Sequence, residues 1–234
     1  MSNIFIIAKK DFKLYFTSPA AYVVLVMFLI LSGWLFTNYL FVEGGQADLR
    51  SIFEVVPFVF LFFIPAISMK QIAEERKNGT MELLVTLPIK DSEIILGKFL
   101  ATFYMVNLAL LLTLTNVVTV ALLGKPDWGV LISGYIGLGF LGAIFTAIGI
   151  YTSSITNNQV VAFITSFFVI FVFLIVDSFL EFLPYPQIFE FLSTNFHYHN
   201  MVKGVLDSRG IVYFISLILI FLTGAVTALE SRKK

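Results

Sequence analysis

Six long stretches of this chain carry almost no charge, and they constrain its fold more than any other feature. Only the second contains an acidic residue, Glu54, and it also contains Pro57 and Pro65. The first stretch would span roughly 36 Å as a helix, enough to cross a hydrocarbon core of ~30 Å. A bilayer admits helices because they satisfy their own backbone groups. We therefore predict six transmembrane helices, at about 19–42, 52–69, 99–123, 130–151, 160–176 and 211–229.

The amino-acid composition indicates that much of the surface of this chain faces the lipid bilayer. Hydrophobic residues make up 59% of the 234 residues, charged residues 13%, and 27 residues are Phe. A soluble domain of this length cannot hide so much apolar surface. The formal net charge of zero gives no overall basic field for nucleic acid, and the lack of cysteine excludes disulfides, thiolate metal sites and a cysteine nucleophile. The fold class is all-α, a polytopic membrane protein forming a single transmembrane domain over 1–234.

Residues 2–17 predict an amphipathic helix lying in the membrane interface. One face would hold the apolar side chains Ile4, Phe5, Ile7, Ala8, Phe12 and Tyr15. The other would hold Lys9, Lys10, Asp11 and Lys13. The alternative is a helical start that projects into the cytoplasm. The apolar run that follows is too long for a cleavable signal peptide.

The distribution of Lys and Arg predicts the orientation. With the N-terminus in the cytoplasm, eleven cations lie inside and four outside, the four being Arg50, Lys125, Lys203 and Arg209. Both termini are then cytoplasmic. The longest inner connection is 70–98, and the longest outer one is 177–210, which we expect to form interfacial or re-entrant structure.

The sequence lacks the motifs of a self-sufficient enzyme. Gly97-Lys98 is followed by Phe99, so the phosphate-binding G-x-x-x-x-G-K-[ST] loop is missing, and the spans contain no catalytic cluster. His197 and His199 could hold a metal on an extended segment, but no third ligand is evident. We favour an interfacial segment there, with Phe189, Phe191, Leu192, Phe196, Tyr198 and Met201 dipping into the outer leaflet. We predict no catalytic, cofactor or metal site in this chain.

The inner connection predicts a short exposed helix. Asn78-Gly79 is a turn signal, Thr80 can cap the helix that follows, and Pro88 ends it. A helix over Thr80–Leu87 would present Met81-Glu82-Leu83-Leu84 to the cytoplasm. Such apolar side chains either dock a partner or rest on the membrane or the bundle.

This connection resembles the signature loop of ABC-2 type permeases. The matching pattern is E-E-R-K-x-G-T-M-E-L-L-x-x-x-P from Glu74 to Pro88, followed by Gly97-Lys98. Phe16-Thr17-Ser18-Pro19 with Tyr22, and the outer segment from Phe196 to Phe214, resemble the branch that holds the gliding-motility-associated permease GldF and the copper-maturation permease NosY.

The resemblance implies a type V exporter-like permease fold and a function in ATP-driven export in the bacterial cytoplasmic membrane, and it points to a gliding-motility-type complex. A separate ABC ATPase would bind ATP and Mg, and a second permease subunit, identical or related, would complete a dimer surrounded by membrane lipids. The residues that would couple to the ATPase are Glu75, Arg76, Gly79, Thr80, Met81, Glu82, Leu83 and Leu84. The short link Thr152–Gln159 would also touch the ATPase. The alternative function is a membrane assembly or anchoring component without a soluble cargo.

Two features inside the spans have packing explanations. Pro57 and Pro65 would bend the second span, either as plain packing or as a gating hinge. The small residues Gly139, Ala143 and Ala147 would let helices approach closely, within the subunit rather than across a dimer.

Overall fold

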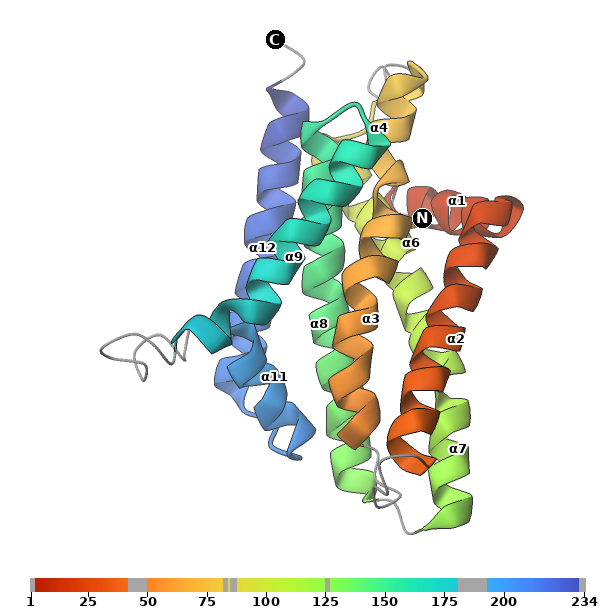
Figure 1. Ribbon diagram of the computed structural model, residues 1–234. Coiled ribbons are helices and arrows are strands. Elements are labelled where there is room, and N and C mark those ends of the chain that lie inside the picture. Colours follow the sequence, from red (N-terminus) through yellow and green to blue (C-terminus); the bar gives the residue numbers. More distant parts are fainter. Residues whose placement is uncertain are drawn as a thin grey trace.

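The computed structural model is a bundle of long helices (Figure 1). It describes residues 3–41, 50–81, 84, 88–124, 127–180 and 193–231. The helices are α1 (Asn3–Thr17), α2 (Pro19–Phe41), α3 (Arg50–Ser68), α4 (Lys70–Lys77), α6 (Asp91–Leu112), α7 (Leu114–Leu123), α8 (Trp128–Ile155), α9 (Gln159–Leu180), α11 (Thr194–Val202) and α12 (Ser208–Glu230). The described residues contain no strand, so the predicted all-α class is confirmed.

Among the residues that the structure describes, six helical stretches are long and apolar enough to span a membrane. They are Pro19–Asn38, Ile52–Lys77, Asp91–Leu123, Trp128–Ile155, Gln159–Val176 and Ser208–Glu230. Each of the six predicted spans coincides with one of them or overlaps it. The second stretch joins α3 to α4 through Met69, and the third joins α6 to α7 through Thr113.

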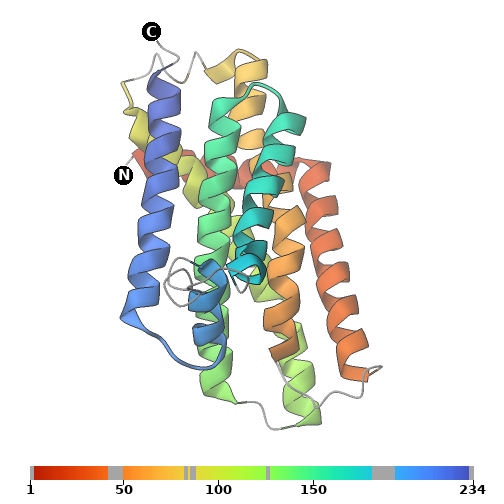
Figure 2. The same cartoon turned by 60° about the vertical axis from the view of Figure 1, so that its left-hand side comes forward.

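Helix α8 forms the centre of the bundle. It contacts α3, α4, α6, α9, α11 and α12, and Figure 2 shows it behind α9 and α11. Ala143 and Ala147 lie in a buried cluster with Leu222 and Ala225 of α12. These two small residues therefore pack within the subunit, whereas Gly139 has no side-chain or backbone atom near its Cβ position.

The backbone carbonyl that Pro57 leaves without a donor in α3 accepts a hydrogen bond from α11. Proline has no N–H, so it cannot donate to the carbonyl of Phe53 four residues earlier. The Tyr198 hydroxyl of α11 donates to that carbonyl at 2.6 Å. This hydrogen bond ties α11 to α3 at the turn that contains Pro57.

Helix α11 places its two histidines differently from the extended segment considered for metal binding. His197 is buried and stacks near Tyr213 with ring centroids 4.5 Å apart, whereas His199 is exposed. No group of three potential metal ligands occurs among the described residues. Tyr198 and Met201 are buried against the bundle, so the prediction that they dip into the outer leaflet is wrong. Phe189, Phe191 and Leu192 lie outside the described residues.

Helix α1 crosses the bundle instead of running along it, at the same end as α4 (Figure 1). It packs on α6. Gly97 permits this contact, because a Cβ there would lie 2.7 Å from the Ile7 side chain. We call this region, where α1, α4 and the start of α6 meet, the α4 end of the bundle.

Candidate functional site

The α4 end contains a cluster of four charged side chains drawn from three helices. We call Lys10, Asp11, Glu75 and Lys98 the charge cluster. The Lys98 ammonium lies 3.1 Å from Asp11 Oδ2 and 2.7 Å from Glu75 Oε2. Lys10 Nζ lies 3.3 Å from Asp11 Oδ1 and 3.7 Å from Glu75 Oε1. The cluster therefore joins α1, α4 and α6 by charge.

Burial makes this cluster structurally important. The side chains of Lys98 and Asp11 are 1% and 3% exposed, and Glu75 is 20% exposed. Buried charges are costly unless each has an opposite partner. Of the two cations in the cluster, only Lys98 is buried. It therefore provides the buried positive charge that neutralises the carboxylates of Asp11 and Glu75. Asp11 is buried, so the prediction that it shares the polar face of 2–17 with the three lysines is wrong. Phe5, predicted on the apolar face, is exposed on the surface of the bundle, which agrees with a side chain that faces lipid.

A second polar group lies one turn further along α1. The Tyr15 hydroxyl donates to the Ile67 carbonyl, accepts from Gln71 Nε2, and lies 3.0 Å from Thr102 Oγ1. Burial raises the pKa of Tyr15 to about 12, so the phenol remains a neutral donor at physiological pH. Tyr15 thus fixes α1 to the break between α3 and α4.

Ser153 of α8 occupies the same break. Its hydroxyl accepts from the N–H groups of Ile72 and Ala73 and donates to the Met69 carbonyl, all within 3.1 Å. The first-turn N–H groups of a helix lack partners within the helix. Ser153 therefore caps α4 from a neighbouring helix, which a reading of α4 alone cannot reveal.

Helix α4 ends as the Asn78-Gly79 signal predicts. Gly79 has φ +70°, a left-handed conformation suited to glycine, and its N–H donates to the Arg76 carbonyl. The Thr80 hydroxyl donates back to the Glu75 carbonyl at 3.1 Å. The chain after α4 is thus tied to α4 by its first residues.

The predicted coupling residues fall into two groups. Glu75, Arg76 and Met81 face the bundle: Glu75 joins the charge cluster, Arg76 donates to the Ser154 carbonyl, and Met81 is buried in one cluster with Ile72 and Ile94. Gly79 and Thr80 are exposed, and Leu84 is half-buried. Glu82 and Leu83 lie outside the described residues.

The link between α8 and α9 divides in the same way. Ser153 and Ser154 are buried against α4, while Asn157 and Asn158 are exposed. The Asn158 side chain accepts from the Val160 N–H and so caps α9. The predicted link, Thr152–Gln159, thus presents exposed side chains outward only from Ile155 onward.

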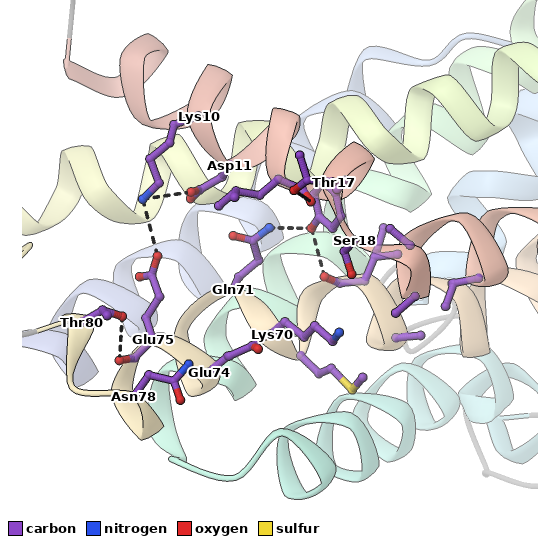
Figure 3. A pocket seen from close by; sticks show the side chains of 18 of the residues that line it. Lys10, Asp11, Thr17, Ser18, Lys70, Gln71, Glu74, Glu75, Asn78 and Thr80 are labelled. Carbon is purple, nitrogen blue, oxygen red and sulfur yellow. Dashed lines mark hydrogen bonds and ion pairs between the residues drawn. The ribbon is translucent and has the colours of Figure 1, made fainter.

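A cavity of about 530 Å³ lies beside the charge cluster. Figure 3 shows α4 lining one side with Lys70, Gln71 and Glu74, opposite Lys10 and Asp11 of α1. Thr17 and Ser18 mark the corner where α1 meets α2, and Leu84 also reaches the cavity.

Six spanning helices with this charged assembly at one end define a multi-pass membrane protein. The chain matches the model of the ABC-2 family transporter protein over residues 5–229, and it belongs to that family. Membership makes the chain a membrane permease subunit of an ABC transporter, and it implies an ABC ATPase as partner. No curated protein sequence matches the chain.

Proposed function

We propose that this permease couples ATP hydrolysis by a separate ATPase to export, with the segment from Thr80 to Leu87 as the contact on which the ATPase pushes. ATP and Mg are bound by the ATPase. A second permease subunit, identical or related, completes the transporter in the bacterial cytoplasmic membrane, with both termini in the cytoplasm. The segments resembling GldF and NosY favour that branch and a gliding-motility-type complex.

The observation that carries this proposal is the way the segment is mounted on the bundle. Its first residues are tied to α4 through Thr80, and Met81 is buried against Ile72 and Ile94. Helix α4 is in turn fixed by the charge cluster and by Ser153. A force applied to the segment therefore reaches α1, α6 and α8 together, because close-packed elements move as units.

The continuity of α3 and α4 extends this path into the membrane. Only Met69 separates the two helices, and its N–H donates to the Pro65 carbonyl at 2.9 Å. The second candidate span thus runs from the charged α4 end to the far end of the bundle. This continuity supports a mechanical connection between the ATPase contact and the spans.

The test is a charge reversal, Glu82→Arg, in the chain co-expressed with its ABC ATPase. We expect ATPase co-purification and permease-dependent ATP hydrolysis to fall by about tenfold or more, because a reversed charge within an interface opposes binding. The measurements are pull-down yield and phosphate release in proteoliposomes.

Glu230→Arg is the matched control. Glu230 is exposed at the end of α12 and lies outside the segment, so its reversal makes the same change in net charge without altering the segment itself. We expect wild-type binding and hydrolysis from this variant. Wild-type behaviour of Glu82→Arg in both measurements would refute the assignment of the coupling segment.

A further inference from the structure

The cavity beside the charge cluster combines a polar and an apolar half. Its polar side is formed by α4 with Lys70, Gln71 and Glu74, and its apolar side includes Val24 of α2 and Ile67 of α3. It lies at the corner between α1, which crosses the bundle, and α2, which spans it (Figures 1 and 3). An amphipathic ligand matches such a division, since its two ends need different surroundings.

Besides members of the charge cluster, the polar half presents one further charge of each sign. Lys70 and Glu74 lie one helical turn apart, on the same face of α4. Within the described parts of the chain, neither side chain takes part in an ion pair or hydrogen bond. This contrasts with the adjacent charge cluster, in which all four charges are paired.

Gln71 adds an amide acceptor between these two charges. Its side chain is 9% exposed, and its Nε2 donates to the Tyr15 hydroxyl. No described group donates to its Oε1 atom, and this atom is not among the fully buried polar atoms. It can therefore accept from the N–H groups of a ligand in the cavity.

The opposite wall favours an anion. Ala20 and Ala21, in the first turn of α2, line the cavity. The first turn of α2 is the positive end of the helix dipole, although its Ala21 N–H already donates to the Ser18 carbonyl at 3.2 Å. Together with the unpaired Lys70 ammonium, this dipole makes the cavity complementary to phosphate there.

We propose that the cavity binds the headgroup of a phospholipid with a primary ammonium group, that is, a phosphatidylethanolamine-type lipid. The phosphate lies toward Lys70 and the start of α2, and the ammonium lies toward Glu74 and Gln71 Oε1. The acyl chains leave past Val24 into the membrane. The proposal concerns the isolated permease and does not depend on coupling to an ATPase.

The test is native mass spectrometry of the full chain released from mild detergent, after incubation with equal amounts of dioleoyl phosphatidylethanolamine and dioleoyl phosphatidylglycerol. We expect the wild-type chain to retain the ethanolamine lipid preferentially. Glu74→Gln should lower this retention by about three- to tenfold and abolish the preference, because a charge-assisted hydrogen bond at a half-buried site is lost. Lys70→Gln should lower retention of both lipids.

Two further variants separate the site from general effects of charge and folding. Lys77→Gln removes an exposed cation of α4 that does not line the cavity, and should bind like wild type. Ala20→Trp keeps every charge but fills the cavity, and should reduce retention of both lipids. Circular dichroism melting identifies any variant that fails to fold.

Two outcomes would overturn the proposal. One is a wild-type preference for phosphatidylglycerol, and the other is unchanged lipid retention in folded Glu74→Gln and Ala20→Trp. If these two variants also lose ATPase co-purification, the cavity belongs to the ATPase contact instead. The proposed function is tested separately by Glu82→Arg, so the two can fail independently.

Discussion

At the scale of single residues, Lys98 is the side chain whose removal should cost most. It is fully buried and faces carboxylates from α1 and α4. In Lys98→Met, Asp11 and Glu75 remain buried without their shared cation, and removing one partner of a buried pair costs about 3 kcal/mol or more. We expect a corresponding drop in the melting temperature of the detergent-solubilised chain.

The neutral triple variant Asp11→Asn, Lys98→Met, Glu75→Gln separates charge from packing. It should recover most of the lost stability, because no uncompensated buried charge remains. Lys10→Met is the control: Lys10 is 48% exposed, and an exposed pair contributes about 0–1 kcal/mol. A Lys98→Met variant as stable as Lys10→Met would contradict a buried, mutually dependent cluster.

At the scale of helices, the hydrogen bond between α11 and α3 at Pro57 can be tested by mutation. Tyr198→Phe removes the hydroxyl that donates a hydrogen bond to the Phe53 carbonyl, which Pro57 leaves without a donor in α3. An unpaired buried carbonyl costs about 1 kcal/mol in a membrane bundle. We expect Tyr198→Phe to lower thermal stability by that amount.

The same substitution in a Pro57→Ala background should cost less. Alanine restores an N–H that can donate to the Phe53 carbonyl within α3. A double-mutant cycle from the four melting curves measures the difference. Equal losses in both backgrounds would show that Tyr198 contributes by packing alone.

The helices themselves could be predicted from sequence, but the joints between them could not. Six runs with almost no charge predicted the spans, and Asn78-Gly79 predicted the end of α4. Both signals are local in the sequence. Tyr198 and Phe53 are 145 residues apart, and nothing in either segment indicates the other. Pro57 indicated that the Phe53 carbonyl lacks its donor within the helix, but not which residue supplies one.

The charge cluster shows the same limit within the candidate site. The sequence prediction placed Asp11 on the same helix face as Lys9, Lys10 and Lys13, because all four are charged and the other face is apolar. Periodicity gives directions around one helix but not the identity of the neighbouring helix. The available signal was weak: Asp11 is the only acidic residue in 2–17, and Lys98 ends a motif just before an uncharged run. Ser153 gave no signal, because its role depends on the break at Met69.

At the scale of the whole molecule, the proposed orientation can be tested because the chain has no cysteine. Lys77→Cys places a thiol on the exposed end of α4, and Lys203→Cys places one in the exposed turn after α11, toward the other end of the bundle. A membrane-impermeant maleimide should label Lys203→Cys in intact spheroplasts, and Lys77→Cys only after lysis. This pattern follows from the eleven cations predicted inside against four outside. The reverse pattern would put the segment from Thr80 to Leu87 on the side without ATP, and coupling through that segment would then be physically excluded.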